Sequence, residues 1–78
     1  TKARALELAV DAAYRMNRFA AMDTCMSMIT SVDNDEFGVH VAGVMQRNPH
    51  SFITGIEPSQ CKSESVRSAL RALQAEKA

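Results

Sequence analysis

The cysteines and histidines of this sequence, whose side chains can bind zinc or take part in nucleophilic catalysis, are Cys25, His40, His50 and Cys61. Zinc sites in small domains usually take two ligands from one turn, spaced as C-x₂₋₄-C or H-x₃₋₅-H. The intervals here are 15, 10 and 11 residues, so no single turn supplies such a pair. We therefore predict no metal site and no cofactor, and we interpret both cysteines as free, buried thiols.

Catalysis would require a nucleophile, a base and an orienting acid in one cleft, and no spacing in this sequence indicates such a set. The densest carboxylates are Asp33, Asp35 and Glu36, and they are explained by a place at a helix start, where negative charge is favourable. The three glycines are scattered and form no phosphate-binding loop. We therefore expect the protein to bind a partner and not to be an enzyme.

Methionine is unusually frequent for a chain of this size, with five in 78 residues. Flexible thioethers can repack against varied apolar partners, although the commoner role of methionine is to fill a core. Phe19, Met22 and Met26 recur at helical spacing, and Met28 follows two residues later. We take these four side chains as the candidate protein-binding surface.

The element that would carry Phe19 is an N-terminal helix over residues 2–21, and its possible extension to residue 31 would carry the three methionines. Its apolar residues recur at alternating steps of three and four, the period of one helical face: Leu6, Ala9, Ala13, Met16 and Ala20. Alanines on this face would let a second helix come close. Residues 22–31 fit both an extension of this helix and a strand, and the helix is favoured because no Gly or Pro interrupts the chain there.

A second helix is predicted over residues 34–47. Asp33 and Glu36 form a capping-box pattern at its start. Asn48-Pro49 ends it, because a residue that precedes proline avoids the helical conformation.

Residues 48–62 are predicted to be a loop or a single irregular turn, since two prolines and a glycine fall within them. A competing interpretation of the middle of the chain pairs residues 24–32 with residues 38–45 as a β-hairpin. That pairing would give an αββα domain.

The last element is a helix over residues 63–76, with Ser63 as its expected N-cap. Its sequence, S-E-S-V-R-S-A-L-R-A-L-Q-A-E, resembles the recognition helix of winged-helix transcription regulators, which reads S-x-x-V-R-x-A-L-x-x-L-x-x-E. The resemblance implies that the helix starting near Asp33 is the first of the motif and that Pro49 to Ile56 hold the second. It also implies that four side chains face DNA phosphates or base edges: Ser63, Ser65, Arg67 and Arg71.

The length and the charge of the chain limit how many domains it can form and which partners it can attract. A chain of 78 residues is expected to form one domain, because two smaller cores could not each bury enough apolar surface. Nine basic and nine acidic residues give a net charge of zero, so no general attraction to nucleic acid or to a membrane is expected. No apolar stretch suits a signal sequence or a membrane span, and we expect a cytoplasmic protein.

These patterns predict an all-α bundle of three or four short helices, with the α+β αββα arrangement as the alternative. The predicted function is that of a regulatory adaptor or inhibitor, which contacts another protein through a helical apolar face, as a phage or mobile-element accessory protein would. The alternative is a small DNA-binding regulator of the helix-turn-helix kind. A homodimer is also considered, because association of two copies would add stability to a protein with a modest core.

Overall fold

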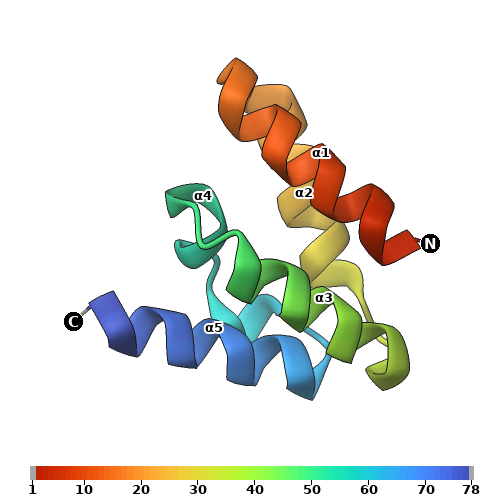
Figure 1. The fold of residues 1–78 in the computed structure, drawn as a ribbon. Helices are drawn as coiled ribbons and strands as arrows, with labels where there is room; N and C mark the ends of the chain where they lie inside the picture. Colours follow the sequence, from red (N-terminus) through yellow and green to blue (C-terminus); the bar gives the residue numbers. More distant parts are fainter. Residues whose placement is uncertain (1, 78) are drawn as a thin grey trace.

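The computed structural model describes the backbone of residues 2–77. This part of the chain consists of helices and turns, and it contains no strand. The predicted all-α bundle is therefore confirmed, and the αββα alternative is wrong. In chain order the elements are α1 (Lys2–Met16), α2 (Phe19–Ser31), α3 (Asp35–Arg47), α4 (Ser51–Thr54), the 3₁₀ turn η1 (Pro58–Gln60) and α5 (Glu64–Lys77) (Figure 1).

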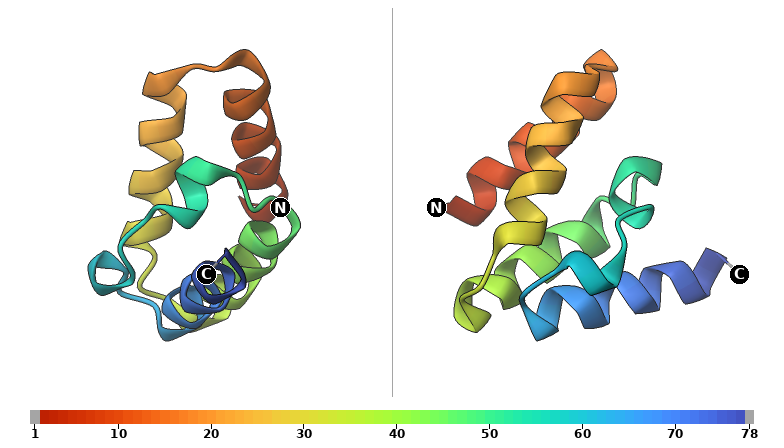
Figure 2. Two further views of the ribbon diagram at one scale, coloured as in Figure 1. Left: turned by 90° about the vertical axis from the view of Figure 1, so that its left-hand side faces the viewer. Right: turned by 180° about the vertical axis from the view of Figure 1, so that it is seen from behind.

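The helices form a hairpin that rests on a helix pair. α1 and α2 run antiparallel and stand side by side, while α3 and α5 lie alongside each other below them (Figure 1, Figure 2). α4 contacts both α2 and α5, and so lies between the hairpin and the pair. The base of the hairpin therefore packs on α3, whereas its tip, where α1 turns into α2, projects away from the pair (Figure 2).

One cluster of buried side chains joins the hairpin to the helix pair. It is mainly aliphatic, and Phe37 and Phe52 pack against its edge. Burying an aliphatic side chain of this kind stabilises a fold by about 1.5–3 kcal/mol. The largest fully buried apolar members come from every α-helix: Leu6, Val10, Ile29, Val41, Val44, Met45, Ile53, Val66 and Leu70.

The prediction of one uninterrupted helix over residues 2–21 is wrong, because the chain reverses at Asn17. This residue has a φ of 51°, the left-handed conformation that asparagine tolerates better than most residues. Its N–H bonds the Tyr14 carbonyl at 3.2 Å, and the Arg18 N–H bonds the Ala13 carbonyl at 3.2 Å. These two bonds form a Schellman motif, which ends α1 so that α2 begins as a separate helix.

The buried face of α1 is also rotated from the predicted one. Leu6 and Ala13 are buried as expected, but Ala9 and Met16 are exposed, and Val10 lies in the core instead. The reason is that α2 and α3 both pack on α1, so the core lies along the side of the helix that faces both.

Asn34, and not Asp33, is the N-cap of α3. Its side-chain oxygen accepts the N–H of Phe37 at 3.1 Å, so the helix predicted over residues 34–47 begins one residue later, at Asp35. Asp33 also has a suitable oxygen. The cap is Asn34 because this residue has the extended conformation that directly precedes the helix.

The segment predicted as a loop over residues 48–62 is partly helical. The His50 carbonyl accepts the N–H of Ile53 at 2.9 Å, which starts the single turn of α4, and Pro58 begins η1. Ile53 and Ile56 are buried. Burial of these two side chains holds the segment against the core. The prolines and the glycine indicated only that the chain turns here, and not that the segment packs on the core.

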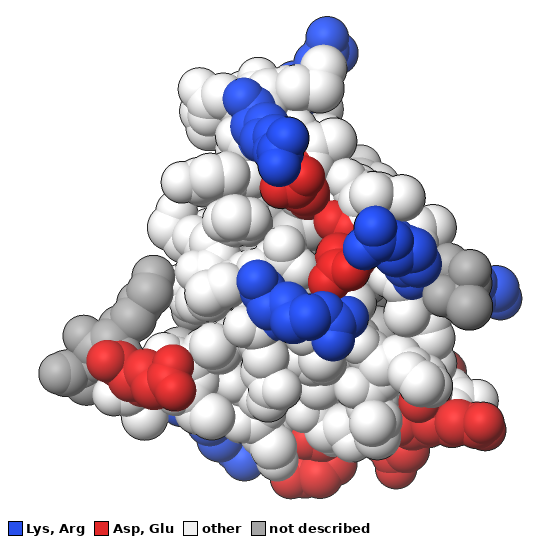
Figure 3. Space-filling model, in the orientation of Figure 1, with Lys and Arg blue, Asp and Glu red and all other residues white. Residues whose placement is uncertain are grey.

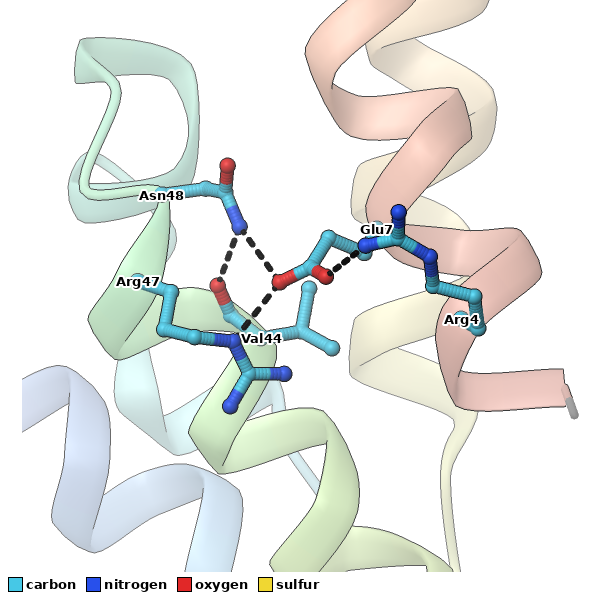
Figure 4. A network of polar contacts seen from close by, with 5 residues as sticks. All are labelled: Arg4, Glu7, Val44, Arg47 and Asn48. Carbon is cyan, nitrogen blue, oxygen red and sulfur yellow. Dashed lines mark hydrogen bonds and ion pairs between the residues drawn. The ribbon is translucent and has the colours of Figure 1, made fainter.

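Glu7 joins the hairpin to the end of α3 (Figure 4). One of its carboxylate oxygens accepts from Arg47 Nε at 2.8 Å and from Asn48 Nδ2 at 3.1 Å, and the other accepts from Arg4 Nη1 at 2.7 Å. Asn48 Nδ2 also donates to the Val44 carbonyl at 2.9 Å. Hydrogen bonds from Arg47 and Arg4 hold the pKa of Glu7 below its ordinary value. We call this network the Glu7 clamp.

α3 and α5 pack closely where Gly38 faces Ser63. A Cβ atom at position 38 would come within 3.1 Å of the Ser63 Cβ and closer still to its hydroxyl oxygen. Ser63 is only 1% exposed, and its hydroxyl donates to Asp35 Oδ1 at 3.4 Å. Glycine at position 38 therefore permits this approach, although it lowers the helix propensity of α3.

Gly38→Ala should destabilise the protein by about 1–3 kcal/mol, because overpacking against Ser63 outweighs the gain in helix propensity. Gly43→Ala is the matched control in the same helix. A Cβ there meets only the end of the flexible Arg47 side chain, at 3.2 Å from Nη1, so this variant should be neutral or more stable. Urea denaturation measures both effects, and equal effects would contradict the close packing at Gly38.

Glu7→Gln should lower the stability of the protein at pH 7, since the neutral amide loses the charge that the clamp binds. Because folding lowers the pKa of Glu7, the stabilisation is present above the ordinary value of 4.5 and is lost as the pH falls through the lowered pKa. The native protein and the variant should therefore converge in melting temperature at acidic pH.

The control for this measurement is Asp11→Asn, which removes the exposed pair of Asp11 with Arg15 on the same helix. Exposed pairs of this spacing contribute little, so the control should melt close to the native protein at pH 7. A Glu7→Gln variant as stable as the control at pH 7 would show that the clamp does not stabilise the fold.

Candidate binding surfaces

Three of the four candidate protein-binding residues lie together. Phe19, Met22 and Met26 are three and four residues apart on one side of α2, and Phe19 is 73% exposed. They line a hollow of about 350 Å³ between the tip of the hairpin and α4. We call it the hairpin-tip hollow, and its lining residues are Tyr14, Asn17, Phe19, Met22, Asp23, Met26, Ser51 and Phe52.

The turn at Asn17 and the segment around α4 bring these residues together. Phe19 is the first residue of α2, directly after the reversal, and so it lies at the tip. The Tyr14 ring stacks on His50, with ring centroids 3.8 Å apart and planes 8° apart. His50 in turn lies near Phe52, with centroids 6.1 Å apart. The stack thus ties α1 to the α4 segment beside the hollow.

The described lining of the hollow includes one carboxylate. Asp23 follows Met22 on α2, and it forms no ion pair with any residue that the structure describes. Asn17 and Ser51 add an amide and a hydroxyl to the lining. The site therefore combines aromatic rings and thioethers with a single negative charge.

Met28, the fourth candidate, lies apart from the other three. It is 45% exposed and lines a separate apolar groove of about 390 Å³. Two residues along a helix correspond to about 200°, so Met26 and Met28 must point to opposite sides of α2. The other lining residues of this groove are Lys2, Ala5, Leu6, Ala9 and Phe37.

Tyr14 and Phe52 are the aromatic lining residues that sequence reasoning missed, and the polar lining residues Asn17, Asp23 and Ser51 were not predicted either. Tyr14 belongs to α1 and Phe52 to the segment predicted as a loop, and no periodic pattern links either residue to α2. Tyr14 could have been placed next to Phe19 only if the reversal of the chain at Asn17 had been predicted, because that turn folds α2 back against α1.

The outer face of α1 is a further exposed apolar surface. Leu8 and Met16 are each more than half exposed there. On the surface of the helix, the positions that lie between these two side chains are alanines. Their small side chains offer little area to bury on binding. This face is therefore a weaker candidate than the hairpin-tip hollow.

The four residues that the winged-helix resemblance implies do not share one exposed surface. Ser63 is buried against α3, and Ser65 is half-buried beside Gly38. Arg67 Nη1 donates to the carbonyl oxygens of Cys61 at 2.8 Å and Lys62 at 3.1 Å. Its Nη2 pairs with Glu64, whose pKa the hydrogen bond from Arg67 lowers. Of the four, Arg71 alone is exposed.

The arginines of α1 and α3 lie close to carboxylates. In Figure 3 the basic side chains in the middle of the visible face lie beside acidic ones. Glu7 pairs with both Arg4 and Arg47, and Asp11 pairs with Arg15. Charge on this face is therefore locally balanced, which weakens its attraction for a polyanion.

The two thiols are buried and free, as predicted. Burial raises the pKa of both Cys25 and Cys61, which disfavours the reactive thiolate. Among the described residues, no three His, Cys, Asp or Glu side chains gather in a way that could hold a metal ion. Within the same residues, each helix is too short or too polar to span a bilayer.

No protein-family model, curated protein or solved structure matches this chain. Its function therefore has to be inferred from the chemistry of its own surfaces. Among the described residues, the hairpin-tip hollow combines the most exposed aromatic side chain with a carboxylate that pairs with none of them.

Arg67→Ala should destabilise the protein by about 1–2 kcal/mol, because the Cys61 and Lys62 carbonyls lose a charged donor. Arg71→Ala removes an exposed arginine from the same helix and should change the free energy of unfolding by less than about 0.5 kcal/mol. Chemical denaturation of the two variants measures the difference. Equal stabilities would show that Arg67 has no structural role and would strengthen the DNA-binding alternative.

Proposed function

We propose that this protein is a non-enzymatic adaptor or inhibitor that binds a protein partner through the hairpin-tip hollow. The observation that carries the proposal is the exposure of Phe19 at the projecting tip, beside Met22 and Met26. Protein interfaces depend on a few central aromatic anchors, and clustered exposed apolar side chains mark such sites.

The structure of the tip suits this role. The Schellman motif at Asn17 and the stack of Tyr14 on His50 hold the hollow in place before any partner arrives. A preformed site loses less conformational entropy on binding than a flexible one. The polar rim that interfaces usually have is supplied by Asn17, Asp23 and Ser51.

The DNA-binding alternative has less support. Arg67 uses its donors within the protein, and Ser63 is buried, so two of the four expected contacts would require a rearrangement. A homodimer through the apolar groove at Met28 is a separate arrangement that does not compete with the hollow. A cytoplasmic location agrees with the two free thiols, because such compartments keep thiols reduced.

Phe19→Ala should strongly reduce capture of the partner from a lysate of the source cells. Loss of a central aromatic anchor costs about 2 kcal/mol or more, which corresponds to roughly 30-fold weaker binding. The control is Val39→Ala, which shortens a side chain that is 59% exposed on α3, away from the hollow. The measurement is quantitative mass spectrometry of proteins recovered by each tagged form, with and without nuclease.

The native protein and the Val39→Ala variant should recover one protein at equal yield, and nuclease should not change that yield. Equal recovery by Phe19→Ala would contradict the proposed surface. Recovery that nuclease abolishes would support the DNA-binding alternative instead.

A further inference from the structure

The lining of the hairpin-tip hollow is electron-rich. Three of its eight lining residues are aromatic and two are thioethers, and its charged residue is Asp23. None of its described lining residues is a lysine or an arginine. Aromatic ring faces carry partial negative charge and attract cations, most strongly where water is partly excluded.

The carboxylate of the lining disfavours a purely apolar ligand, and the carboxylate and the aromatic rings together disfavour an anion. A purely apolar side chain would leave the Asp23 carboxylate unused and partly desolvated, which is unfavourable. An anion would be repelled by both the carboxylate and the ring faces. A cation with an apolar stem is the group that satisfies the whole set, since its stem contacts the thioethers and its charge meets the carboxylate.

Among protein cations, arginine fits better than lysine. Its guanidinium group is planar, is more weakly hydrated than an ammonium group, stacks on ring faces and pairs with a carboxylate through two parallel hydrogen bonds. Tyr14 already has His50 stacked on it at 3.8 Å, while Phe19 is largely exposed. The side-chain oxygens of Asn17 and Ser51 can accept the remaining N–H groups.

We infer that the hairpin-tip hollow binds an arginine side chain of the protein partner, with Asp23 as the counter-ion and the aromatic side chains as its walls. The inference rests on the proposed function and specifies the chemistry of its partner. The volume of about 350 Å³ is large enough to hold one arginine side chain, and it lies at the lower end of the range of about 300–1,000 Å³ for ligand sites.

The test is a titration of the native protein with Nα-acetyl-arginine methylamide, followed by NMR of the methionine methyl groups. The Met22 and Met26 signals should shift in a saturable way. The citrulline analogue, which has nearly the same shape without the charge, should bind at least about tenfold more weakly, a difference of about 1.4 kcal/mol. The lysine analogue should also bind more weakly than arginine.

Two variants identify the counter-ion. Asp23→Asn should weaken binding of the arginine probe about tenfold, whereas Asp33→Asn, which removes the same charge from an exposed position before α3, should leave it unchanged. Asp23 is exposed and forms no ion pair with any described residue, so the variant should stay folded, and its NMR spectrum checks this.

Several results would overturn the inference. They are equal binding of arginine and citrulline probes, equal or tighter binding of the lysine probe, equal effects of the two variants, or no shift at Met22 and Met26. If capture of the partner still depends on Phe19 in such a case, the proposed function stands and only the arginine inference fails. Capture that is insensitive to Phe19→Ala overturns the proposed function whatever the titration shows.

Discussion

The reversal of the chain at Asn17 is the constraint on which the rest of the fold depends. The N–H groups of Asn17 and Arg18 close the end of α1, at the cost of one left-handed residue. Without the turn, residues 2–31 would form one helix of roughly 45 Å. That is longer than the largest extent of the molecule, 31 Å, and it could not bring Ile29 back into the core beside Leu6.

The same turn determines what the protein leaves exposed. Phe19 begins α2 at the tip, beyond the reach of the core, while the Glu7 clamp fixes the base of the hairpin to α3. The stack of Tyr14 on His50 fixes the end of α1 to the α4 segment. The hollow thus forms because the hairpin is fixed at two places, by the Glu7 clamp and by the stack of Tyr14 on His50. A partner can reach its apolar walls without unfolding any helix.

The sequence predicted the helices whose apolar residues recur at a regular period, and α3 and α5 begin within one residue of the expected positions. It did not predict the turn at Asn17, because Schellman motifs usually carry glycine and asparagine is also tolerated inside helices. Met22 and Met26 were identified because they share one side of a helix. Tyr14 and Phe52 were missed because only tertiary packing brings them to α2.

Site-specific photocrosslinking tests most directly whether the hairpin-tip hollow is the surface that binds. Benzoylphenylalanine would replace Phe19 in one form and Val39 in another, and both forms would be irradiated in the source cells. Both side chains are exposed, so neither substitution should disturb the core. A binding surface at the hollow predicts one defined protein adduct from position 19 and little from position 39. No adduct from position 19, or equal adducts from both positions, would contradict it.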